Sequence, residues 1–82
     1  MSSSIIRMLW GAIPDAYRTV ADKVLSAENK SLPEQLSILT QAERTPGLPV
    51  YLFGLIASAK RALAGKDVEL FEERALKAMG LL

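Results

Sequence analysis

The sequence predicts an all-α protein, a small single-domain bundle of four or five helices. Apolar residues recur at helical spacing, and no segment shows the period-two alternation of a half-buried strand. Proline and glycine separate the apolar stretches at intervals that suit helices. The fifteen residues from Thr45 to Ala59 carry no charge, and they predict a helix over about 49–64 that is apolar almost all the way round. We expect this helix to lie at the centre of the bundle, because a helix of that kind is buried on most sides.

The length of 82 residues predicts one domain, 1–82, and half of its residues are hydrophobic. A chain of this size buries only about 60% of the surface that its unfolded state exposes. We therefore expect some apolar side chains to remain on the surface as a patch, and such patches often mark interfaces. The uncharged run is too short to cross a bilayer, which needs about 20 apolar residues, so we expect no transmembrane segment.

The opening stretch from 4 to about 12 predicts a helix without a clear polar face. Neighbouring apolar residues point in different directions around a helix, so one core cannot take them all. We expect the surplus to form a protein interface with Trp10 as its anchor, since buried aromatic residues dominate binding energy. The predicted interface residues are Ile5, Ile6, Met8, Leu9 and Trp10.

Two amphipathic helices follow. The first is expected from Pro14 to about Ala27, because proline suits a first helical turn. Ser31 and Glu34 fit a capping box, which predicts the start of a second helix that ends by Arg44.

The run Thr45–Pro49 is the strongest break, and Pro49 can start the central helix. Gly65 is well placed just past its end. Asp67 is the expected N-cap of the last helix, and Gly80 its terminator. The expected core of the bundle is Tyr17, Val20, Val24, Leu36, Leu39, Leu52, Phe53, Ile56, Leu63, Phe71, Ala75 and Met79.

Small residues four apart within the apolar helix, Gly54 and Ser58, predict close packing of another helix. The local basic cluster Lys60, Arg61 and Lys66 has two interpretations. Two of these residues complement the negative end of a helix, or the three contact phosphates of a nucleic acid. A small dimeric helical protein can bind double-stranded RNA by shape with modest net charge.

Composition argues against catalysis. The chain has no histidine and no cysteine, which removes the commonest acid–base residue as well as thiolate chemistry and disulfides. The carboxylates Glu69, Glu72 and Glu73 lie among Lys and Arg on a face that we expect to be solvated, whereas a pair of carboxylates that divides acid and base roles needs burial. We expect no enzyme, no metal and no cofactor.

The predicted function is a non-catalytic protein–protein interaction module, either a homo-oligomer or a small subunit or adaptor of a larger assembly. The alternative is the small dimeric nucleic-acid-binding protein that contacts phosphates through Lys60, Arg61 and Lys66. A net charge of +1 lacks the concentrated basic footprint of most such proteins. We expect a cytoplasmic location, with an organelle lumen as the alternative.

Overall fold

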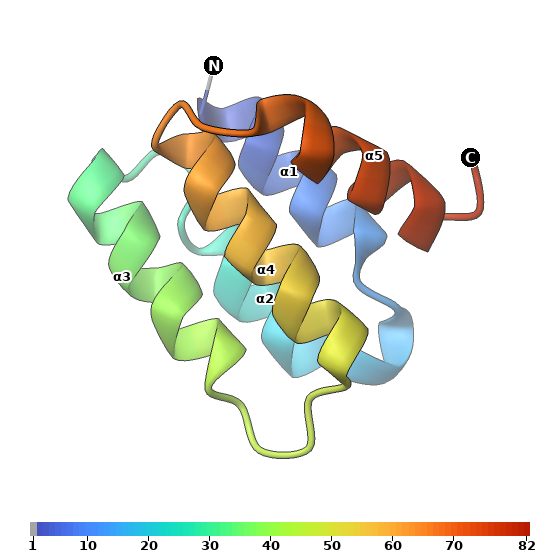
Figure 1. Ribbon diagram of the computed structural model, residues 1–82. Coiled ribbons are helices and arrows are strands. Elements are labelled where there is room, and N and C mark those ends of the chain that lie inside the picture. Colours follow the sequence, from blue (N-terminus) through green and yellow to red (C-terminus); the bar gives the residue numbers. More distant parts are fainter. Residues whose placement is uncertain (1) are drawn as a thin grey trace.

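The computed structural model describes residues 2–82, and every regular element within them is helical (Figure 1). The all-α prediction is confirmed, while Met1, the first residue of the predicted domain, lies outside the described residues. The elements are α1 (Ser2–Ala12), a 3-10 turn η1 (Asp15–Tyr17), α2 (Arg18–Leu25), α3 (Leu32–Glu43), α4 (Val50–Leu63) and α5 (Val68–Ala78).

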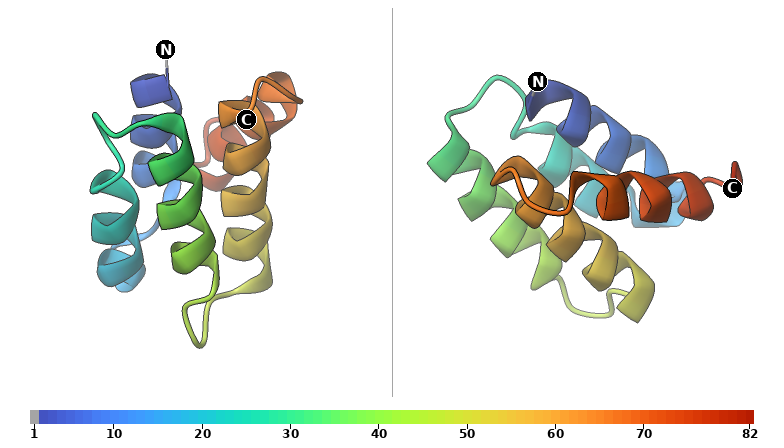
Figure 2. Two further views of the ribbon diagram at one scale, coloured as in Figure 1. Left: turned by 90° about the vertical axis from the view of Figure 1, so that its left-hand side faces the viewer. Right: turned by 45° about the horizontal axis from the view of Figure 1, so that its top comes forward.

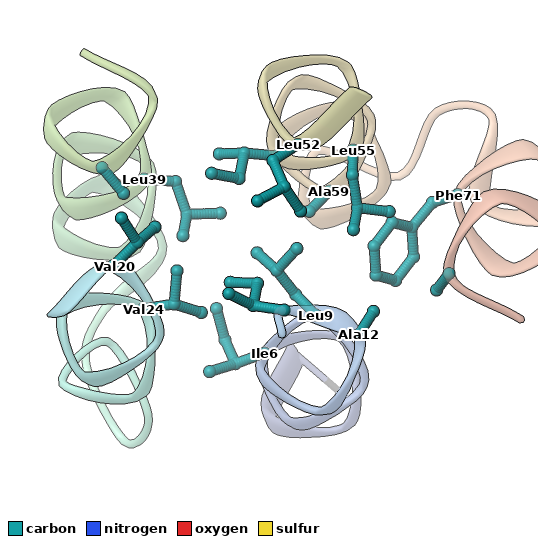
Figure 3. Close-up of a cluster of buried hydrophobic side chains, with 14 of the residues drawn as sticks. Ile6, Leu9, Ala12, Val20, Val24, Leu39, Leu52, Leu55, Ala59 and Phe71 are labelled. Carbon is teal, nitrogen blue, oxygen red and sulfur yellow. The ribbon is translucent and has the colours of Figure 1, made fainter. Parts of the chain in front are cut away.

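Helices α1 to α4 close a ring in which each helix packs against the next and α4 packs back on α1. Helix α5 lies outside this ring and packs against both α1 and α4. Figure 3 looks along the bundle and shows the four helices at four corners, with α5 beside the edge that α1 and α4 form. The right-hand view of Figure 2 shows α5 lying over these two helices.

One apolar core runs through the ring and reaches α5. Ile6 and Leu9 point into its centre from α1, and Phe71 points toward the ring from α5 (Figure 3). Of the expected core residues, those that are buried are Val20, Val24, Leu39, Leu52, Ile56, Leu63, Phe71 and Ala75. Tyr17, Leu36 and Met79 are partly buried against the core. Phe53 is exposed, so its expected place in the core is wrong.

Helix α4 forms one corner of the bundle and is not enclosed on all sides. It packs against α1, α3 and α5, but its outer face has no neighbour, and Val50 is 87% exposed. The physical reason is size, because a chain this short has too few helices to surround one of its own. Part of the excess of apolar surface that the composition predicts therefore lies on α4, where three large apolar side chains are exposed within four residues.

The caps and glycine stops of the helices follow the sequence closely with one exception. The capping box of α3 is present, with the Ser31 hydroxyl accepting from the backbone N–H of Glu34. Gly65 and Gly80 each have a positive φ and end their helices in Schellman motifs, in which the next residue's N–H returns to Arg61 and Leu76, respectively.

The exception is Asp67, which makes no side-chain cap to α5 and has φ of 53°. Its carboxylate instead accepts from Nε of Arg61 at 2.9 Å. The predicted helix from Pro14 also begins differently, because Pro14 is extended and η1 precedes α2.

Removing the Ser31 hydroxyl should raise the pKa of Glu34. That pKa lies below its ordinary value of 4.5 because the Ser31 hydroxyl, and then the Ser31 backbone N–H, donate hydrogen bonds to the carboxylate. Since folding lowers this pKa, the stabilisation is present above the ordinary value and is lost as pH falls through the folded value. We expect Ser31→Ala to shift the NMR titration of the Glu34 carboxyl toward 4.5 and to weaken the acid dependence of the melting temperature.

Ser37→Ala, at an exposed serine of the same helix, should leave the titration of Glu34 unchanged. A Glu34 titration that is the same in Ser31→Ala would contradict this assignment.

Candidate functional site

The first turns of α4 expose three large apolar side chains. Val50 is almost fully exposed, Tyr51 is 53% exposed and Phe53 is 49% exposed. Helical spacing explains their position, because Leu52 and Ile56 occupy the side of α4 that faces the core. Val50 lies on the opposite side, and Tyr51 and Phe53 lie at the two edges of the half of the helix that is turned away from the core. We call Val50, Tyr51 and Phe53 the outer face of α4.

A groove lies beside this face, between the first half of α4 and the second half of α5. The two helices meet at the turn around Gly65 and then diverge (Figures 1 and 2). The groove has a volume of about 620 Å³, and its lining residues are Tyr51, Gly54, Leu55, Arg74, Lys77 and Ala78. A volume of this order lies within the usual ~300–1,000 Å³ of ligand sites. We call this hollow the α4–α5 groove.

The charge in the groove is entirely positive. Arg74 and Lys77 are its charged lining residues, and neither forms an ion pair with a carboxylate among residues 2–82. Both side chains belong to exposed residues. The groove therefore combines apolar walls with two basic side chains that have no ion-pair partner in the described chain.

A short hydrogen-bond chain positions Arg74. Its Nη1 donates to Oγ of Ser58 at 2.7 Å, and that hydroxyl donates to the carbonyl oxygen of Gly54 at 2.9 Å. Ser58 itself is buried. One nitrogen of the guanidinium is thus fixed to α4, while its remaining N–H groups have no hydrogen-bond partner within the described chain.

The predicted close-packing pair, Gly54 and Ser58, does face another helix, and that helix is α5. A Cβ placed on Gly54 would lie 4.0 Å from Nη1 of Arg74, its nearest neighbour. That distance is an ordinary van der Waals contact, so the approach of α5 does not require glycine here.

The same substitution should therefore have opposite effects at two glycines. We expect Gly54→Ala to raise the free energy of unfolding by about 1 kcal/mol, because alanine favours a helix interior by that amount and has room. Gly65→Ala should lower it by about 1 kcal/mol, since a side chain at a φ of +82° is strained even in open space. Urea denaturation followed by circular dichroism measures both changes. Equal signs for the two variants would contradict this explanation.

The predicted first-helix interface is mostly covered by the chain itself. Ile6 and Leu9 are fully buried in the core, and Ile5 and Met8 pack partly against it. The reason is that α1 has three neighbours, α2, α4 and α5, so side chains that point in different directions each find cover. Among these five residues Trp10 is the exposed one, at 40%.

Trp10 borders a second, smaller hollow. This hollow has a volume of about 210 Å³ and also involves Pro14, Asp15 and Arg18. Its two charged residues form an ion pair of 3.5 Å with each other. The hollow is thus smaller than the α4–α5 groove and its charges are already compensated.

The predicted phosphate contacts are largely engaged within the chain. Nζ of Lys60 lies 2.6 Å from Oε1 of Glu43, and these side chains are only 27% and 11% exposed. Arg61 pairs with Asp67. Lys66, the third residue of the cluster, forms no ion pair in the described part of the chain. A phosphate at Lys60 or Arg61 would have to displace a carboxylate that is already in place.

No cluster of metal-ligating side chains occurs among residues 2–82. Within the same range, no helix is both long and apolar enough to span a bilayer.

Neither Tyr51 nor Arg74 was singled out from the sequence. The spacing of Gly54 and Ser58 was the available signal, because it marks the side of α4 that faces Arg74.

Comparison of the chain with protein-family models, with curated proteins and with solved structures finds no match.

Proposed function

We propose that the chain is a non-catalytic protein-interaction module, a small adaptor or subunit of a larger assembly, that binds through the outer face of α4 and the α4–α5 groove. The observation that carries the proposal is the exposure of Val50, Tyr51 and Phe53 on one helix. Exposed apolar surface gains about 25 cal/mol per Å² when a partner covers it. Aromatic residues beside a groove are also the residue type that most often dominates binding energy.

The other two candidate surfaces offer less. The first helix presents Trp10 beside a small hollow, and the basic cluster has carboxylate partners at Lys60 and Arg61. Neither combines apolar area with uncompensated charge, as the surface of α4 and α5 does.

The proposal is tested by NMR titration of the isotope-labelled chain with a neutral amphipathic helical peptide that carries a leucine stripe and a glutamine-rich polar face. We expect chemical-shift changes to gather at Tyr51, Gly54 and Ala78. Tyr51→Ala should weaken binding by about thirtyfold or more, because truncating an aromatic anchor costs about 2 kcal/mol or more.

Trp10→Ala is the matched control, because it also truncates a partly exposed aromatic residue on another surface, and it should leave the affinity unchanged. Shifts centred on Trp10, or a loss of affinity in Trp10→Ala alone, would move the interface to the first helix. Titration with a double-stranded RNA checks the alternative function, for which binding must weaken steeply with added salt.

A further inference from the structure

The α4–α5 groove also specifies the chemistry of its partner. We infer that the groove binds an acidic amphipathic helix of another protein, with a carboxylate of that helix held by Arg74 and Lys77 and an apolar side chain seated between Tyr51 and Leu55. This inference rests on the proposed function. It adds that the partner is acidic, that its bound segment is helical and that it is a different protein.

The charge follows from the guanidinium of Arg74. One nitrogen is held by Oγ of Ser58 at 2.7 Å, so the side chain is ordered before a partner arrives. Its other N–H groups are available, and a guanidinium binds a carboxylate through two parallel hydrogen bonds. Lys77, three residues further along α5, adds a second positive charge to the same lining. Among the basic residues outside the groove, four have a carboxylate partner within residues 2–82 and the others have none. What distinguishes Arg74 and Lys77 is that the two unpaired charges lie together in the lining of one groove.

The apolar part of the partner follows from the rest of the lining. Leu55 is buried, while Tyr51 and Ala78 are exposed on opposite sides of the groove. Gly54 adds no side chain, so the space over it stays open. The lining thus favours a ligand with an apolar side chain close to an acidic one.

The secondary structure of the partner follows from backbone hydrogen bonding. Residues 2–82 contain no strand, so a bound peptide cannot extend a sheet. A segment covered by apolar walls must then satisfy its own N–H and C=O groups, because unpaired buried backbone groups are costly. A helix does so internally, and an amphipathic helix in a groove between helices is a recurrent mode of recognition.

A second copy of the chain offers no acidic residue from the groove itself. A twofold dimer places the same patch on both subunits, and the lining of this patch carries Arg74 and Lys77 and no carboxylate. The exposed Glu69, Glu72 and Glu73 of α5 lie outside the lining, so a dimer would have to pair through the edge of the groove. An acidic helix of another protein places its carboxylate in the groove directly. We expect the free chain to scatter light as a monomer.

The test uses three helical peptides of about five turns, roughly 18 residues, with one leucine stripe and with glutamate, glutamine or lysine on the polar face. Calorimetric titration should rank them glutamate, glutamine, lysine in order of decreasing affinity. Arg74→Gln should weaken the glutamate peptide about tenfold to a hundredfold, the range for a hydrogen bond to a charged group. It should leave the glutamine peptide nearly unchanged.

Three variants complete the design. Arg74→Lys keeps the charge but loses the paired N–H groups, so its affinity should fall between those of the wild type and Arg74→Gln. Lys77→Met should also weaken the binding of the glutamate peptide. It removes no ion pair within the described chain, so it stays informative if Arg74→Gln is unstable. Arg44→Gln is the matched control for charge, because Arg44 is exposed at the end of α3 without an ion pair in residues 2–82.

The outcomes separate the two levels of the proposal. The inferred partner is wrong if the groove binds the glutamate and glutamine peptides equally or prefers the lysine peptide. It is also wrong if neither Arg74→Gln nor Lys77→Met changes the affinity for the glutamate peptide. Each of these results leaves the proposed interaction surface in place. Failure of all three peptides to shift the resonances of Tyr51, Gly54 and Ala78 overturns the surface as well.

Discussion

Phe71→Ala should lower the free energy of unfolding by about 3–5 kcal/mol, the usual range for a buried phenylalanine. Phe71 is fully buried, and with Ala75 it makes up the buried residues of α5. Figure 3 shows its ring pointing from α5 to the edge that α1 and α4 form. Small domains have only about 5–15 kcal/mol of stability in total, so we expect α5 to detach before the ring unfolds.

Urea denaturation gives the loss of stability, and hydrogen exchange shows where it falls, since the amides of α5 should lose protection first. Leu70→Ala is the neighbouring control. Leu70 is exposed, so its truncation should change stability by no more than about 0.5 kcal/mol. A similar loss of unfolding free energy in Phe71→Ala and Leu70→Ala would show that the burial of Phe71 is not what holds α5 against α1 and α4.

Leu9→Ala should be the second large effect, a loss of about 2–5 kcal/mol. Leu9 is fully buried at the centre of the ring, so its truncation leaves a cavity among α1, α2 and α4. Trp10→Ala, one residue away, should cost much less, because Trp10 is exposed at the rim of a small hollow.

Thermal melts and light scattering on both variants decide between a core and an interface role for α1. Truncating a core residue lowers the melting temperature by the same amount at every protein concentration. Truncating an interface residue changes the oligomeric state, and the resulting change in melting temperature depends on protein concentration. Leu9→Ala that melts like the wild type but alters assembly would restore the first helix as the interface.

The sequence predicted the helices and most of their ends, because these depend on local chemistry. The capping box of Ser31 and Glu34 and the glycine stops at Gly65 and Gly80 involve residues only a few positions apart. Asp67 is the instructive failure. Its sequence position suits a cap, but the carboxylate accepts instead from Arg61, six positions earlier in the last turn of α4. Asp67 also has a positive φ, and capping preference alone does not say which of these two partners a carboxylate will take.

The outer side of α4 could not be predicted, and the site depends on it. Helix α4 is apolar on nearly every side, so periodicity does not say which side faces the core, and Phe53 was assigned to the core but lies outside. The groove was out of reach as well, since Arg74 meets Ser58 across two helices.

In α1 a signal was present and was missed. Ser4, Arg7 and Gly11 recur at helical spacing on one exposed side, which marks the other side as the core face, whereas the buried Ile6 and Leu9 were assigned to a surface.

The closed ring also has a consequence for the order in which the chain is made. Helix α1 is synthesised before α4, yet Ile6 and Leu9 are fully buried in the closed ring, in which α4 packs back on α1. At about 5–20 residues per second, translation from α1 to the end of α4 takes several seconds. During that time the apolar side chains of α1 lack the part of their cover that α4 supplies, and they can bind chaperones or other nascent chains. Packing of α4 against α1 closes the ring and shortens this period of exposure.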